Sequence, residues 1–166
     1  MINELVRANP HPNVLNYEGC IVQDGHVSGV VFRKLKVLLI DVVRAKFGSD
    51  LARSISNSQY DVKNGDLPPL DNVMTDVRAG LQHLLSLGMV YLDISPRNIM
   101  WDDDDESWVL IDLSECYAPG TVFYDEIPGT PRWKDVNAHV VSKKLHEPML
   151  AKLENYIKTG VLPERE

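Results

Sequence analysis

Several absences limit what this chain can be. No apolar run is long enough to cross a bilayer, and the opening MINELVRANPHPN contains no apolar secretory signal. Basic residues are the minority, 17 against 24 acidic ones, which gives a formal charge of −7. That balance argues against nonspecific binding to nucleic acid or to anionic membranes. We therefore expect neither a nucleic-acid partner nor a membrane partner.

Cysteine and metal-binding histidine patterns are equally sparse. The two cysteines, Cys20 and Cys116, lie far apart, so we expect reduced thiols in a cytoplasmic or nuclear protein rather than a disulfide. The five histidines show none of the spacings of zinc ligands. What remains is ordinary: 166 residues, 44% of them hydrophobic and 25% charged, are typical of one globular domain.

Two β-hairpins are expected. In residues 14–35, two β-rich runs flank Asp24-Gly25, a dipeptide that favours a tight turn. The second run contains the continuous apolar stretch Val30–Phe32, which predicts a strand covered on both faces. Further along, "NIMW" and "WVLID" are predicted to pair across the acid run 102–106. We interpret that run as a solvated turn, because consecutive side chains cannot converge on one metal ion without a looping backbone.

Helical periodicity predicts three helices. The first covers 37–47 and ends at Gly48, and the last covers 142–158. The clearest covers 72–87, with Asp71 as its N-cap and Gly88 as its stop. Between the first two helices, residues 48–70 are polar and interrupted by Gly and Pro, which predicts a loop.

Three polar residues stand among apolar neighbours within LGMVYLDISPRNIMWDDDDESWVLIDLSE. They are Asp93, Asn98 and Asp112. Burying a carboxylate is costly unless it meets a cation or hydrogen-bond donors. These residues are therefore the best candidates for a functional site.

The same residues carry a resemblance to eukaryotic protein kinases. "YLDISPRN" resembles the catalytic loop H-R-D-L-x-x-x-N, and "IDLS" resembles the D-F-G metal-binding segment. Around them, "HPNVLNYEGC" and "GVVFRKL" are similar to the fourth and fifth strands of the small lobe. "LQHLLSLGMVYLD" is similar to the helix before the catalytic loop, and "PGTPRW" to the G-T-x-x-Y/W segment. The resemblance covers nearly the whole chain and implies an α+β, protein kinase-like fold in a single domain, 1–166. Residues 1–35 would form a partial small lobe with the hinge, and residues 36–166 a mainly helical large lobe.

The resemblance also implies roles for individual residues. Asp93 would accept the proton of a substrate hydroxyl, while Asn98 and Asp112 would hold magnesium that bridges the phosphates of ATP. Further contacts with the nucleotide would come from the hinge and from the catalytic loop: Phe32 as gatekeeper, Arg33, Leu35 and Arg97. The partner would be a protein substrate with Ser or Thr hydroxyls or a regulatory protein, and the oligomeric state is left open.

Several departures from the family bear on activity. Tyr91 and Leu92 stand where His and Arg are usual, Ser95 replaces the Lys that contacts the transferring phosphate, and Ser114 replaces the Gly of D-F-G. The sequence contains neither a glycine-rich loop nor a V-A-I-K lysine before "HPN". Since positioning supplies several kcal/mol of such a barrier, we expect the chain as written to be a poor catalyst.

Three alternatives follow from these departures. The chain is a serine/threonine-type protein kinase domain, a pseudokinase that acts as a binding module, or a small-molecule phosphotransferase of the aminoglycoside or choline kinase type. The last class shares a D-x-x-x-x-N…D core, whereas "HPNV", "VVFRKL" and "PGTPRW" favour the protein kinase branch.

Overall fold

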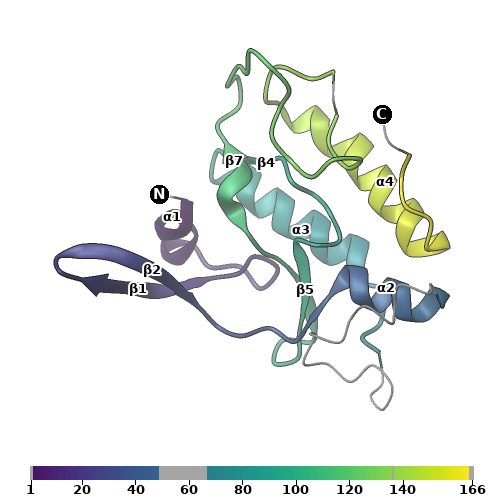
Figure 1. Cartoon of the computed structure of the whole chain (residues 1–166), viewed down its shortest axis with the longest axis horizontal. Coiled ribbons are helices and arrows are strands. Elements are labelled where there is room, and N and C mark those ends of the chain that lie inside the picture. The colour runs from purple at the N-terminus through teal and green to yellow at the C-terminus, as the bar shows by residue number, and fades with distance from the viewer. Residues whose placement is uncertain (1, 49–66, 136, 165–166) are drawn as a thin grey trace.

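Helices and short antiparallel sheets alternate along the chain (Figure 1). The structure is a computed structural model that describes residues 2–48, 67–135 and 137–164, so most of the predicted loop at 48–70 lies outside the described residues. The elements are α1 (Ile2–Ala8), β1 (Tyr17–Gln23), β2 (His26–Phe32), β3 (Val37–Leu38), α2 (Leu39–Phe47), α3 (Val73–Ser86), β4 (Val90–Tyr91), β5 (Ile99–Asp102), β6 (Ser107–Leu110), η2 (Leu113–Glu115), β7 (Cys116–Tyr117), η3 (Lys143–Leu145) and α4 (His146–Thr159).

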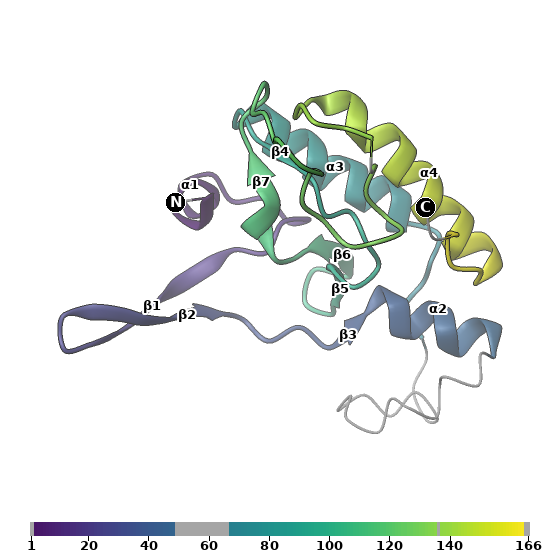
Figure 2. The same ribbon diagram turned by 45° about the horizontal axis from the view of Figure 1, so that its top comes forward.

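The first hairpin forms where the sequence predicts it, but its environment differs. Gln23 pairs with His26 across a turn in which Asp24 and Gly25 have positive φ angles of 51° and 79°. The ribbon then projects away from the rest of the chain (Figures 1 and 2). The expectation that Val30–Phe32 is covered on both faces is wrong, because these side chains are 37–46% exposed. Within the described residues the ribbon pairs only with itself, and α1 packs near its base.

The second hairpin, β5–β6, belongs to a three-stranded sheet with the order β3-β5-β6, in which β5 is the central strand. Trp101 of β5 meets Trp108 of β6 edge to face, with ring centroids 5.4 Å apart. Residues 103–106 of the acid run are exposed, as expected of a solvated turn, but Asp102 departs from that expectation. Asp102 is buried and forms an ion pair with Arg33, 69 positions earlier, and Lys36 pairs with Asp103. Through these ion pairs the turn holds residues 33–36, the linker between the first hairpin and β3, in place.

The predicted helices are present with shifted ends. α2 begins two residues later than expected because Val37–Leu38 forms β3, which pairs with β5. Gly48 ends the helix at φ 65°. At the start of α3, Asn72 rather than Asp71 occupies the N-cap position, without a side-chain cap. Gly88 follows α3 at φ 78°, as predicted. A short 3-10 turn, η3, precedes α4.

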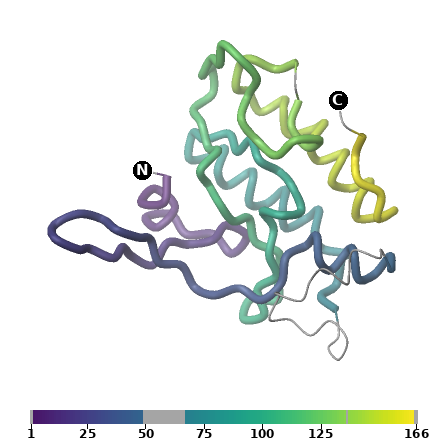
Figure 3. The backbone as a smooth tube through the Cα atoms, in the orientation of Figure 1, coloured from purple at the N-terminus to yellow at the C-terminus, as the bar shows by residue number. Residues whose placement is uncertain are grey.

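One core joins these elements. α3 and α4 run side by side in both ribbon views, and Figure 3 traces the linker from the hairpin past β5 to α2. The largest fully buried side chains of this core come from the strands, from the loops and from α2, α3 and α4, and include Trp108, Tyr91, Tyr156, Leu39, Leu84, Leu92, Ile94, Ile99 and Leu153. Among the described helices, none is both long and apolar enough to cross a membrane.

The "HPN" segment anchors β6, the strand that leads to Asp112. Its Asn13 side chain donates to the Trp108 carbonyl at 2.9 Å, and its own carbonyl accepts from the Leu110 amide at 2.9 Å. α3 approaches this loop so closely that a Cβ on Gly80 would lie 2.7 Å from the Asn13 oxygen. The position of β6 is therefore set from both sides.

Candidate active site

Two short strands bring the segments that carry the site together. β4 pairs with β7 through Val90–Tyr117 and Tyr91–Cys116, and the Leu92 amide donates to the Glu115 carbonyl at 2.9 Å. Because this pairing is antiparallel, the chain entering Asp93 lies beside the chain that leaves Asp112. Residues 19 positions apart are thus held in neighbouring segments.

Both oxygens of Asp93 accept hydrogen bonds. The Asn98 side-chain nitrogen donates to Oδ2 at 2.6 Å, and the Thr130 amide donates to Oδ1 at 2.7 Å. The first donor comes from the same loop and the second from "PGTPRW". A carboxylate held at both oxygens has a fixed orientation, which a general base requires.

Asn98 is fixed through its backbone and its side chain. Its amide donates to the Ser95 carbonyl and its carbonyl accepts from the Ile111 amide, both at 3.0 Å. Its side-chain nitrogen also approaches the Asp93 carbonyl at 3.2 Å. Since the nitrogen is engaged by Asp93, the side-chain oxygen is the atom suited to a cation.

Asp112 lies directly beyond β6 in a left-handed backbone conformation, with φ 51° and ψ 72°. Asp and Asn adopt this region more readily than other residues with a Cβ. Its Oδ1 accepts from the Ser114 amide at 3.4 Å, and the side chain is exposed. The carboxylate is therefore accessible from solvent, as a ligand for an incoming metal ion must be.

The buried side chain of Tyr91 links the segment that leads to Asp93 with the segment that leads to Asp112. Its hydroxyl donates to the Ile111 carbonyl at 3.0 Å, next to Asp112. Burial raises the pKa of Tyr91 well above its usual value, and the charges of Asp93 and Asp112 add to this effect. Both acids thus lie within electrostatic reach of the same hydroxyl, which stays protonated. From the sequence, Tyr91 is noted only because it stands where the kinase motif has His, and its hydrogen bond to Ile111 is found only in the structure.

The "PGTPRW" segment packs directly on residues 92–98, the Asp93 loop. Gly129 has a φ of 131°, and a Cβ there would lie 2.9 Å from the Leu92 carbonyl oxygen. The next residue supplies the Thr130 amide to Asp93, and its hydroxyl lies 3.5 Å from the hydroxyl of the buried Ser95. The motif indicated a turn here, but its contact with Asp93 could only be seen in the structure.

His146, the first residue of α4, contacts the backbone of Tyr91, just before the Asp93 loop. Its side chain is buried and its Nε2 lies 3.0 Å from the Tyr91 carbonyl oxygen. Because a carbonyl oxygen only accepts, Nε2 carries the proton. Burial lowers the pKa of His146, which favours the neutral ring.

Both cysteines are free thiols, as the sequence predicts. Burial, followed by the charges of Glu115 and Asp112, raises the pKa of Cys116 to about 12. The thiol beside the site is therefore protonated and a weak nucleophile.

The predicted nucleotide contacts at the hinge lie apart from this cluster. Phe32 ends β2 and meets Tyr17 edge to face at 6.2 Å, and Leu35 is buried. Arg33 is bound to the acid turn. Within the described residues, no hydrogen bond or ion pair joins these side chains to the cluster of Asp93, Asn98 and Asp112. Their assignment to the nucleotide stays a prediction.

Arg97 lies on the side of α2 and α4. Its side chain is exposed, and its charge acts on Asp41 of α2 and Tyr156 of α4. The backbone of the same loop meets α2, where the Ile40 amide donates to the Pro96 carbonyl at 2.9 Å. A contact between Arg97 and phosphate stays a prediction.

The donor set suits a hard divalent cation. The described residues contain no group of three or more His, Cys, Asp or Glu side chains that could hold a metal ion. A site with one carboxylate, Asp112, and one amide oxygen, Asn98, would need its other ligands from phosphates and water. Magnesium is commonly bound in this way, with few protein ligands.

Comparisons with known proteins agree with this architecture. No protein-family profile matches the chain. Over 91 residues, 54% of this chain and 14% of the relative, it is 28% identical to Wee1-like protein kinase 2 of Mus musculus. Its structure is similar to that of the Cydia pomonella granulovirus kinase PK-1, with a TM-score of 0.66 and 16% identity. That match covers 94% of this chain and 54% of the viral kinase, so the chain spans about half of its length. The chain therefore has an α+β, protein kinase-like fold.

Proposed function

We propose that this chain binds a magnesium–nucleotide complex and transfers a phosphoryl group to a hydroxyl of a protein substrate. The observation that carries the proposal is the orientation of Asp93 by Asn98 and Thr130, at 2.6 and 2.7 Å, on a kinase-like fold. In phosphoryl transfer, positioning and electrostatic stabilisation supply most of the catalysis.

Each residue has a distinct part in this proposal. Asp93 accepts the proton of the attacking hydroxyl, and Thr130 keeps its carboxylate in place. Asn98 and Asp112 provide oxygen ligands for magnesium. When bound, the metal neutralises charge on the phosphates. Tyr91 holds the Ile111 carbonyl and thereby the backbone that presents Asp112.

The departures from the family leave this arrangement intact. Leu113 is 5% exposed and fills an apolar position after Asp112. The missing cation at Ser95 removes a contact to phosphate and lowers the expected rate, while the oriented Asp93 remains. We therefore expect slow transfer with a clear dependence on Asp93 and magnesium.

Nucleotide binding provides the first test. In isothermal titration with ATP and magnesium, Asp112→Asn should weaken binding about tenfold or more, because the metal loses a charged ligand. Asn tolerates the left-handed backbone and keeps an acceptor for the Ser114 amide, so the loop should stay folded. Asp104→Asn, on the exposed acid turn, is the matched control. Unchanged magnesium-dependent affinity in Asp112→Asn would contradict the proposal.

Transfer provides the second test. With radiolabelled ATP and a degenerate Ser/Thr peptide mixture, Asp93→Asn should abolish labelling but leave nucleotide affinity within about twofold. Binding without any transfer by the unsubstituted chain would instead indicate a pseudokinase. Labelling of free aminoglycosides or choline in preference to peptides would indicate a small-molecule phosphotransferase.

A further inference from the structure

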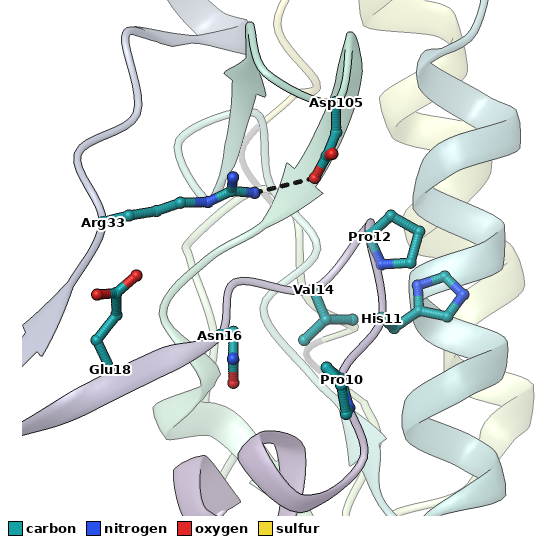
Figure 4. A pocket seen from close by; sticks show the side chains of 8 residues that line it. All are labelled: Pro10, His11, Pro12, Val14, Asn16, Glu18, Arg33 and Asp105. Carbon is teal, nitrogen blue, oxygen red and sulfur yellow. Dashed lines mark hydrogen bonds and ion pairs between the residues drawn. The ribbon is translucent and has the colours of Figure 1, made fainter.

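A pocket of about 420 Å³ lies between the base of the β1–β2 hairpin, the "HPN" segment and the acid turn (Figure 4). Neither Asp93, Asn98 nor Asp112 lines it. We propose that this pocket binds an arginine side chain from an extended segment of a partner protein. The proposal uses other residues than the proposed phosphoryl transfer, and each can fail without the other.

One wall of the pocket is largely apolar and carries no net charge. Pro10, Pro12 and Val14 supply apolar surface, and the ring of His11 lies beside them (Figure 4). That ring stacks on His83 with centroids 4.7 Å apart, and its Nδ1 accepts from the Asn13 amide. Burial, followed by the charge of His83, lowers the pKa of His11, so the ring tends to be neutral. Such a wall suits the aliphatic stem of a long side chain.

The opposite rim is acidic. Glu18 of β1 is exposed and has no ion-pair partner among the described residues, and Arg33 lies between it and Asp105 of the acid turn (Figure 4). Among the described lining residues Arg33 is the one cationic side chain, and it pairs with Asp102, with Asp105 at 3.3 Å and with Asp104 at 4.0 Å. Two of the lining side chains, Glu18 and Asp105, are carboxylates against this one guanidinium, so the lining carries net negative charge and attracts a second cation.

The chemistry favours arginine within an extended peptide. A guanidinium offers a planar fork of donors that two separate carboxylates can share. Beyond the pocket, the ribbon carries exposed apolar side chains, among them Val31 and Ile21, which are 39% and 51% exposed and share a face because Ile21 pairs with Gly29, two residues before Val31. These side chains provide apolar contacts for the residues that flank the arginine. A partner segment with an arginine flanked by aliphatic residues therefore fits this surface.

Fluorescence anisotropy with the whole chain and the labelled peptide Leu-Ala-Pro-Arg-Pro-Leu tests the proposal. Glu18→Gln together with Asp105→Asn should weaken binding about tenfold, since each exposed charge pair contributes up to about 1 kcal/mol. Replacing the arginine of the peptide by glutamine should have a similar effect. Glu154→Gln with Glu164→Gln changes the net charge equally on a distant surface and should alter the affinity less than about twofold.

Three outcomes would overturn the proposal. One is the absence of binding up to about 1 mM peptide. The others are an equal loss in the distant double variant and equal binding of a peptide with glutamate in place of arginine. Urea unfolding of both double variants shows that the fold is retained. Asp93→Asn should bind the peptide normally, which separates this pocket from the proposed catalysis.

Discussion

The Asp93 loop (residues 92–98) and the β1–β2 hairpin contain similar apolar residues in opposite environments. In the loop, Leu92 and Ile94 are fully buried although they belong to no regular element. In the hairpin, Ile21 is 51% and Val27 is 65% exposed although both lie in regular strands.

The contrast shows that regular backbone and burial have separate causes. A tight turn and β-branched residues suffice to form a two-stranded ribbon, but such a ribbon cannot cover its own faces. The Asp93 loop is covered by three distant segments: β7, the residues around Gly129, and His146 at the start of α4. Rigidity at Asp93 is therefore a property of packing and not of local sequence.

Truncating one isoleucine in each region should give the largest difference. Ile94→Ala leaves a cavity in the core and should lower the free energy of unfolding by about 2–5 kcal/mol. Ile21→Ala removes an exposed side chain and should change it by about 0.5 kcal/mol or less. Urea titration of both variants measures the comparison. Equal losses would show that the hairpin is covered in solution.

Glycine substitutions sharpen the role of packing around Asp93. Gly129→Ala places a Cβ against the Leu92 carbonyl in addition to the strain of its positive φ, and should cost about 2–3 kcal/mol. Gly120→Ala shares the positive φ, at 87°, but meets no atom within 4 Å, and should cost about 1 kcal/mol. Differential scanning fluorimetry ranks the two. The reverse order would mean that the segment does not rest on the loop.

The acid turn allows a smaller comparison between a buried and an exposed charge. Asp102→Asn weakens the pair with Arg33 at a buried carboxylate and should destabilise the chain by about 1–2 kcal/mol, discounted because Arg33 is one-third exposed. Asp103→Asn disturbs the exposed pair with Lys36 and should cost about 0.5 kcal/mol or less. Chemical denaturation at low and high salt distinguishes them. A similar cost for both would contradict the buried anchoring of the linker.

Acidification should affect the loop more than the hairpin. The folded pKa of His146 is lowered by burial, so the unfolded chain binds more protons below about pH 6.5. The contribution of His146 to the free energy of unfolding is fully present above that pH, and it is lost as the pH falls towards the lowered pKa of the folded state. His146→Gln should reduce this slope. Because His11 also has a lowered pKa, His11→Gln is measured in parallel. An unaltered slope in His146→Gln would count against its neutral, buried state.

The sequence by itself determined the local elements and marked the candidate site residues. Asp24-Gly25 defines a hairpin turn, the spacing of Val73, Val77 and Leu81 defines one face of α3, and both agree with the structure. Turn chemistry and periodicity act over a few residues, so a linear reading recovers them. The kinase-like order of motifs likewise indicated the fold that the structural comparison shows.

Only the tertiary structure decided what surrounds these elements. The pairing of β4 with β7, the Thr130 amide on Asp93 and the burial of Asp102 by Arg33 each join residues far apart in the chain. The exposure of Val30–Phe32 is decided in the same way, because it depends on which layers lie above the strand. Such contacts depend on the packing of the whole chain, and no local pattern encodes them.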